Sequence, residues 1–270
     1  MPDSRYSSLQ LRVMSACVLA PIAIGALYFG GLYFAVFLGL ASIAMSYEWC
    51  MASISARQVL FTIVMVITVL VSLWFSYYSA LSQAITALIC GAAVMALMGS
   101  VFKQGADLIW LSLGPFCIGL PVASLLIIRN EPDVGFALAM TLFFVIWATD
   151  IGAYFSGKTI GGPKIAPSIS PNKTWAGLFG GMIAAMITAY GMVYFLINAE
   201  IAPFGILLLG GASAILAQAG DFSESAWKRK FGIKDASNLI PGHGGVLDRL
   251  DGVLFVAPGL MILLLLTSGN

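Results

Sequence analysis

Ionisable side chains are concentrated in one stretch of this sequence, between Gln218 and Gly252. The stretch holds five of the thirteen Lys and Arg residues, five of the twelve Asp and Glu residues, and the single histidine. Carboxylates are the ligands that hard cations such as Mg²⁺ prefer, and Lys and Arg bind phosphate oxygens. The stretch therefore indicates chemistry on a nucleoside triphosphate, with a divalent cation between the protein and the phosphates.

Four polar residues at the start of this stretch have the spacing of one helical face. The spacing i, i+3, i+4, i+7 is that of Asp221, Glu224, Ser225 and Lys228. They share a face if the preceding apolar segment continues as a helix. A solvated helix end with extended Lys and Arg side chains is the alternative interpretation. The position of Asp221 favours a functional interpretation of these residues. Asp221 directly follows an apolar segment, and a carboxylate at membrane depth is energetically costly and usually functional.

A glycine-rich turn, Pro241-Gly242-His243-Gly244-Gly245, follows a short polar connector. Glycine lets the backbone approach a ligand closely, and successive N–H groups can bind phosphate, although such turns are also common between helices. Asp248 and Asp251 come next, at the start of the last apolar segment. Asp248 is either an acid that complements a helix N-terminus or a metal ligand opposite Asp221, with Asp251 in support.

A second polar group follows the sixth apolar segment. Its members are Asp150, Tyr154, Lys158, Gly161-Gly162, Lys164 and the run Ser170-Pro171-Asn172-Lys173-Thr174. Ser170 and Thr174 are expected caps of the next helix, with Pro171 in its first turn. Lys173 is placed to meet an anionic head group at the mouth of a helix bundle.

Glu48 is a further acid at membrane depth, near the end of the second apolar segment and next to Trp49. It is either functional or an interfacial residue beside its aromatic neighbour. The residues alone leave both interpretations open.

The elements that must position these groups are apolar. The chain is 60% hydrophobic and 9% charged, with a mean hydropathy of +0.97. Soluble domains carry about 25% charged residues, so an ordinary cytosolic globule is excluded. Nine segments approach the roughly 20 residues that cross a bilayer. They are about 12–29, 32–50, 59–78, 83–101, 106–128, 134–155, 177–198, 203–220 and 246–267. We predict an all-α fold, a transmembrane helix bundle of about nine spans in a single domain, 1–270.

The basic residues predict the orientation of this bundle. With a cytoplasmic N-terminus and nine spans, twelve of the thirteen Lys and Arg residues, Arg5 among them, fall on the inner side and only Arg129 falls outside. This bias is what the positive-inside rule describes. It places both polar regions, 150–177 and 218–252, on the cytoplasmic side.

The polar residues of the C-terminal region resemble the signature of the phosphatidate cytidylyltransferase family, also called CDP-diacylglycerol synthase. The matching residues are Ser225-Ala226-Trp227-Lys228-Arg229, Lys234-Asp235, Pro241-Gly242-His243-Gly244-Gly245 and Asp248-Arg249-Leu250-Asp251. The upstream region is similar to the second conserved region of the family through Asp150, Tyr154, Gly157-Lys158, Gly161 and 170–174. It departs from the family at Ala176, where members often carry Glu.

The resemblance implies an enzyme that converts CTP and phosphatidic acid into CDP-diacylglycerol and pyrophosphate for phospholipid biosynthesis. It also implies a Mg²⁺ requirement, a metal pair whose second ion is divalent or monovalent, a homodimer without a nucleic-acid partner, and residence in a bacterial inner membrane with the active site facing the cytoplasm. The metal ligands it implies are Asp221 and Asp248, to which we add Glu224.

The remaining roles are hypotheses for the residues that match the family pattern. The predicted catalytic residues are Asp221, Asp248, Lys173, Lys228, Arg229, His243 and Asp251. The predicted substrate-binding residues are Asn172, Ser225, Lys234, Asp235, Gly244, Gly245, Arg249 and Asp150. Among them, we expect Lys228, Arg229, Lys234 and Arg249 to contact the CTP phosphates. Lys173 and Asn172 are expected to contact the lipid phosphate. His243 is expected to contact phosphate or shape the loop.

Two other functions fit parts of the same pattern. A membrane transporter of an anionic substrate also uses intramembrane acids and kinked helices, but it predicts ionisable residues near the middle of several spans. A related nucleotidyltransferase with a different lipid acceptor would carry nearly the same residues. A structural scaffold has no need of the glycine turn and the aspartate spacing.

Overall fold

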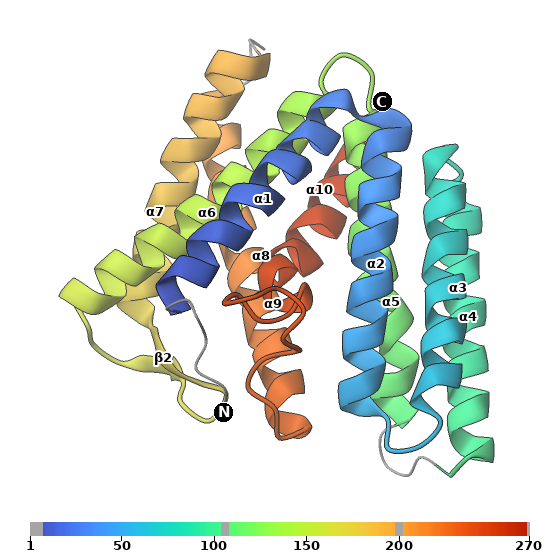
Figure 1. Cartoon of the computed structure of the whole chain (residues 1–270). Helices are drawn as coiled ribbons and strands as arrows, with labels where there is room; N and C mark the ends of the chain where they lie inside the picture. Colours follow the sequence, from blue (N-terminus) through green and yellow to red (C-terminus); the bar gives the residue numbers. More distant parts are fainter. Residues whose placement is uncertain (1–7, 104–107, 198–201, 269–270) are drawn as a thin grey trace. The chain divides into compact units, whose positions relative to one another are not determined.

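The structure is a computed structural model that describes residues 8–103, 108–197 and 202–268. Arg5 and the predicted start of the fifth segment, at residue 106, lie outside these ranges. The long helices (Figure 1) are α1 Ser8–Phe29, α2 Gly31–Ser53, α3 Gln58–Tyr77, α4 Leu81–Val101, α5 Leu108–Asn130, α6 Gly135–Thr159, α7 Trp175–Met192 and α8 Pro203–Lys230. The shorter ones are η2 Val193–Ile197, α9 Leu247–Leu250 and α10 Val253–Ser268.

The predicted all-α membrane architecture is confirmed. Among the described residues, eight helices are long and apolar enough to cross a membrane. A bilayer offers the backbone no water, so an apolar run of this length satisfies its N–H and C=O groups as a helix. Some buried hydroxyls are satisfied within their own helix: Ser42 Oγ donates to Leu38 O at 2.7 Å and Ser124 Oγ to Leu120 O at 2.7 Å.

The ninth predicted segment, 246–267, is not one helix. The four-residue helix α9 ends at Leu250, a turn follows at 251–252, and α10 is shorter than the eight long helices. The turn is stabilised by the Asp251 side chain, whose Oδ1 accepts a hydrogen bond from Gly252 N at 2.7 Å. Glycine at position 252 allows the turn to pack close to α6, since a Cβ there would clash with Ile146 Cγ2 at 2.7 Å.

The loop after α6 contains a small antiparallel hairpin that the sequence did not predict. Strands β1 Lys164–Ala166 and β2 Ser170–Thr174 pair with Lys164 opposite Thr174. The predicted capping role of Ser170 is therefore wrong, because Ser170 is the first residue of β2. Thr174 is the N-cap of α7 as predicted, and its Oγ1 accepts a hydrogen bond from Gly177 N at 3.1 Å.

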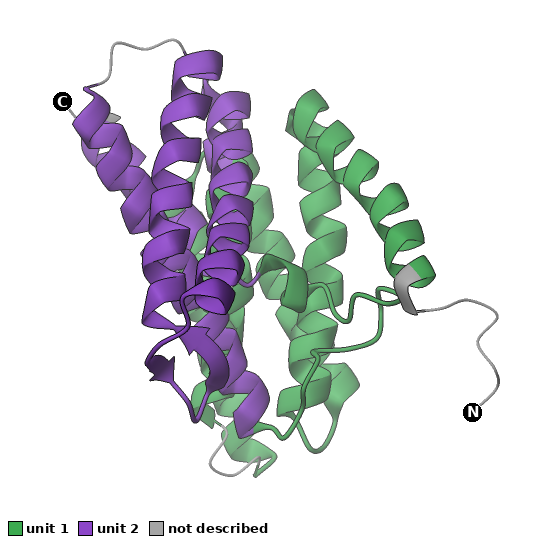
Figure 2. Cartoon of the chain, turned by 90° about the vertical axis from the view of Figure 1, so that its left-hand side faces the viewer, with its two compact units in different colours: residues 1–126, 231–250 green, residues 127–230, 251–270 purple. Residues whose placement is uncertain are grey.

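The chain divides into two compact units, shown in different colours in Figure 2. Unit 1 comprises residues 1–126 and 231–250, and unit 2 comprises 127–230 and 251–270. The division falls inside α5 and again at each end of the loop 231–250. Unit 1 thus combines α1 to α4 with the glycine-rich turn and α9, whereas unit 2 combines α6, the hairpin, α7, α8 and α10.

The packing of unit 2 depends on small residues between α6, α7 and α8. A Cβ on Gly181 would lie 2.9 Å from Thr149 O of α6, and one on Gly210 would lie 2.8 Å from Met186 Cα of α7. Small residues let membrane helices approach closely where no hydrophobic effect drives them together. Buried Val145, Ala185, Ala189, Ile206 and Ala214 form a core cluster there. This packing fixes the ends of α6 and α8 against each other and against the hairpin.

Candidate active site

Unit 2 contains a polar cavity of about 230 Å³ between α6, β2, α7 and α8. Its polar lining consists of Asp150, Tyr154, Asn172, Lys173, Thr174, Gln218 and Asp221. Three of these elements end or begin at the cavity, so side chains far apart in the sequence meet there. The two predicted polar regions, 150–177 and the start of 218–252, are therefore brought together within one unit.

Lys173 and Asp221 form an ion pair in this cavity. Both side chains are partly exposed, at 18% and 30%, but the Lys173 Nζ atom itself is buried. The Lys173 ammonium also lies 4.7 Å from the centre of the Phe222 ring, a cation–π geometry. The lysine is thus held at the cavity by one charge and one aromatic face.

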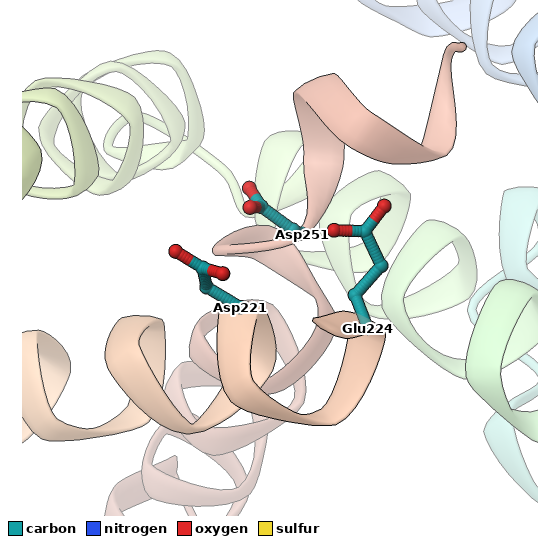
Figure 3. Close-up of side chains that lie close together, drawn as sticks. All are labelled: Asp221, Glu224 and Asp251. Atoms are coloured by element: carbon teal, nitrogen blue, oxygen red, sulfur yellow. The ribbon is translucent and has the colours of Figure 1, made fainter. Parts of the chain in front are cut away.

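Three carboxylates next to this ion pair could hold a metal ion. One oxygen from each of Asp221, Glu224 and Asp251 can be chosen so that all lie within 4.8 Å of one another. Figure 3 shows the two α8 side chains and Asp251, which comes from the turn before α10, gathered in one place. Around an octahedral Mg²⁺ ion, adjacent oxygens are about 3 Å apart and opposite ones about 4 Å apart, so this donor set fits a hard divalent cation once the side chains move closer together.

Asp251 lies outside the eight long apolar helices, in the turn 251–252. Burial, and after it the nearby Asp221 carboxylate, raise the pKa of its carboxyl to about 7. The Gly252 N–H and the Lys173 charge act in the opposite direction. A cation beside Asp221 and Asp251 would offset their mutual repulsion, which is a second reason why the cluster fits a metal ion.

The C-terminal turns of α8 carry several of the predicted site residues. Lys228 Nζ donates to Glu224 Oε2 at 3.0 Å, and Ser225 Oγ donates to Asp221 Oδ1 at 3.2 Å. The predicted shared helical face is thereby confirmed. Arg229 is directed elsewhere, since its Nε lies 3.5 Å from Ile169 O in the hairpin.

The other predicted residues of the C-terminal region belong to unit 1. Asp248 Oδ2 accepts hydrogen bonds from Ala236 N at 2.9 Å and Gly245 N at 2.8 Å. The Arg249 guanidinium donates to His243 O at 2.6 and 3.0 Å, and His243 Nδ1 lies 2.7 Å from Ser15 Oγ of α1.

Two further predicted residues of unit 1, Lys234 and Asp235, are exposed in the connector before the glycine-rich turn. Gly244 has φ +85°, a conformation that favours glycine. Asp221 and Asp248 belong to different units, and their shared ion cluster stays a prediction.

A family model described as the cytidylyltransferase family matches residues 10–267. The chain belongs to this cytidylyltransferase family. The phosphatidate cytidylyltransferase of Brucella suis is 38% identical over 255 residues, which cover 93% of this chain and 91% of the relative. Those of Haemophilus influenzae and Pseudomonas aeruginosa are each 33% identical over 277 and 260 residues. The matches cover 93% of this chain and 96% and 94% of these relatives, respectively.

In this member of the cytidylyltransferase family, the cavity includes two residues for which no role was predicted. Gln218 is buried, lies three residues before Asp221 on α8, and lines the same cavity. Its spacing from Asp221 was the available signal, because i and i+3 share a helical face. Tyr154 lines the cavity from α6, and its hydroxyl accepts a hydrogen bond from Lys158 Nζ at 3.3 Å.

Two larger hollows have a different character. One, of about 340 Å³, is lined by α3 and α4, and the other, of about 400 Å³, is lined by α1 and Leu239-Ile240-Pro241. The first lining is apolar except for Thr68 and the weakly polar Cys90, and the second is apolar except for Ser15. Such surfaces are typical of helices that face lipid, so they do not compete with the polar cavity as the catalytic site.

Gly220 controls how closely the turn 251–252 approaches α8. A Cβ at Gly220 would overlap the carbonyl oxygen of Asp251. We expect Gly220→Ala to destabilise the protein by about 1–3 kcal/mol, because backbone atoms must move. The melting temperature of the detergent-solubilised chain should fall by several degrees. Gly205→Ala is the matched control on the same helix, because nothing lies within 4 Å of a Cβ there. Equal melting temperatures for the two variants would contradict this packing.

Proposed function

We propose that this protein transfers the cytidylyl group of CTP to phosphatidate and so forms CDP-diacylglycerol and pyrophosphate. The observation that carries the proposal is the carboxylate cluster of Asp221, Glu224 and Asp251 beside Lys173, in a chain of the cytidylyltransferase family. A cluster of acids and cations at the end of long apolar helices suits two polyanions, one of which is a lipid. The relatives named above act on phosphatidate by name.

In the proposed reaction, a phosphate oxygen of phosphatidate attacks the α-phosphorus of CTP. A phosphorus–oxygen bond forms there, and the bond to the bridging oxygen of the β-phosphate breaks, so pyrophosphate leaves with the electron pair. The phosphate monoester has a second pKa of about 6 and is largely dianionic at neutral pH. The attacking group therefore needs no strong general base, and charge neutralisation becomes the main requirement.

The cluster Asp221, Glu224 and Asp251 would hold a divalent cation, and Asp248 is the further ligand that the family resemblance implies. Bound there, Mg²⁺ would neutralise charge on the triphosphate and on the departing pyrophosphate. The second ion of a metal pair, divalent or monovalent, belongs to the same proposal. The fit rests on the three converging oxygens and on the mutual repulsion of Asp221 and Asp251.

Lys173 has a role that follows from its partner. Its ammonium neutralises Asp221 when the two form their ion pair. A cation that binds Asp221 competes for the same oxygens, so it would release Lys173 toward an anionic ligand in the cavity. Lys173 would then bind the lipid phosphate together with Asn172, which lines the same cavity.

The proposal is tested with purified full-length protein, CTP labelled at the α-phosphate, Mg²⁺ and phosphatidic acid in mixed micelles. We expect labelled CDP-lipid that depends on phosphatidic acid. Chelation of Mg²⁺ by EDTA should lower the rate at least about 100-fold, and added Mg²⁺ should restore it. Label transferred only to a lipid phosphate without diacylglycerol would favour the related nucleotidyltransferase, and transport without turnover would overturn the enzyme.

The membrane setting belongs to the same proposal. The last turns of α6 and α8 carry basic residues: Lys158 in α6, and Lys228, Arg229 and Lys230 in α8. Arg229 lies close to the hairpin. The positive-inside rule supports a cytoplasmic location for this end and for the N-terminus. The bacterial relatives support the inner membrane, and the family resemblance supports a homodimer. Labelling of single-cysteine variants from either side of the membrane would test the orientation.

A further inference from the structure

Glu48 is a fully buried carboxylate of α2 that the proposed reaction does not use. It accepts three hydrogen bonds from residues about 190 positions away: Ser237 Oγ at 2.6 Å, Val246 N at 2.8 Å and Leu247 N at 2.9 Å. All four residues belong to unit 1. A buried charge is tolerated when donors satisfy it, and here three donors from the glycine-rich loop do so.

The same loop segments are held by Asp248. Asp248 Oδ2 accepts from Ala236 N and Gly245 N, which are the immediate neighbours of Ser237 and Val246. Two carboxylates, one from α2 and one from α9, thus tie the segments 236–237 and 245–247 together. A shift in the hydrogen bonds of Glu48 must alter those of Asp248, because both carboxylates bind adjacent residues of the same segments.

Gly245 gives an independent indication that the contact is close. A Cβ at this position would lie 2.7 Å from Glu48 Oε1 and 2.9 Å from Glu48 Cδ. Gly245 is buried, and its φ does not require glycine. A side chain at this position would meet the Glu48 carboxylate and also Ala236 Cβ, which lies 2.9 Å from the same point.

We propose that Glu48 is a positioning residue for the reaction, which holds the loop 236–247 so that Asp248 keeps the orientation required for metal and substrate. This inference rests on the proposed function. Glu48 touches neither substrate nor metal in this role, and acts through the backbone that carries Asp248. The second interpretation of its sequence position, an interfacial acid beside Trp49, does not account for three buried hydrogen bonds.

The test compares Glu48→Gln, Ser237→Ala and the control Glu131→Gln, which lies in the turn between α5 and α6. Glutamine keeps the shape of Glu48 but turns one acceptor into a donor that faces other donors. We expect kcat to fall about 10- to 100-fold and the half-saturating Mg²⁺ concentration to rise severalfold, as for other residues that orient metal ligands. Ser237→Ala removes one of the three hydrogen bonds of Glu48, together with the bond that Leu239 N donates to Ser237 Oγ, and should have a smaller effect of about threefold.

Hydrogen–deuterium exchange gives a readout that does not depend on activity. In full-length Glu48→Gln, exchange should rise about tenfold in peptides covering 236–250 and stay unchanged in α3. If Glu48→Gln does not accumulate in the membrane, Ser237→Ala carries the test, with faster exchange confined to 236–250.

Three outcomes would overturn the inference: unchanged exchange in the loop, an equal rise in α3, or a lower activity with an unaltered Mg²⁺ requirement. The last two would indicate a purely structural residue. A wild-type chain that makes no CDP-lipid would instead refute the proposed function, and the exchange comparison would still decide whether Glu48 holds the loop.

Discussion

Replacement of Asp221 by asparagine is expected to lower kcat for cytidylyl transfer about 1,000-fold, or about 4 kcal/mol in the activation barrier. Asp221 takes part in three interactions of the unit 2 site. It pairs with Lys173, accepts from Ser225 Oγ, and contributes an oxygen to the carboxylate cluster. Asparagine keeps the shape and the hydrogen bond but removes the charge on which a divalent cation depends.

The measurement combines steady-state kinetics with Mn²⁺ binding followed by electron paramagnetic resonance, because Mn²⁺ also prefers oxygen ligands. Asp221→Asn should bind Mn²⁺ more weakly at an unchanged melting temperature. Asp133→Asn is the matched control: Asp133 is exposed between α5 and α6 at φ +62°, which asparagine tolerates. Near-normal activity of a folded Asp221→Asn protein would refute the metal assignment.

The helical part of the site could be predicted because it depends on local spacing. The positions of Asp221, Glu224, Ser225 and Lys228 are separated by turns of one helix, and α8 continues through Lys230. Long apolar runs likewise determine where membrane helices form, since the bilayer leaves the backbone few alternatives. Both predictions required no knowledge of contacts between distant residues.

The remaining features depend on contacts between distant residues, which no periodicity in the sequence encodes. Asp251 reaches the carboxylate cluster because Gly220 lets its backbone approach α8. The three partners of Glu48 are 189 to 199 residues away. The hairpin was missed for a related reason: Ser170-Pro171 is typical of a helix start, but pairing of β2 with β1 takes precedence.

Replacement of Lys173 by methionine is the second change with a large expected effect. Methionine is an unbranched apolar side chain without the ammonium, so the ion pair with Asp221 and the cation–π contact with Phe222 are both lost. We expect kcat/KM for phosphatidate to fall about 100-fold, because the lipid phosphate loses its cation and Asp221 loses its partner. KM for CTP should change much less, since the CTP phosphates are assigned to other cations.

Lys173→Arg separates charge from geometry. An arginine keeps the ion pair with Asp221 but has a planar group of different reach, so it should recover part of the activity. Lys164→Met, on the paired strand of the same hairpin, is the control for loss of one exposed cation and should stay within about twofold of the wild type. A Lys173→Met protein with unchanged phosphatidate kinetics would show that the lysine only neutralises Asp221. Equal losses in KM for both substrates would instead place Lys173 at the triphosphate.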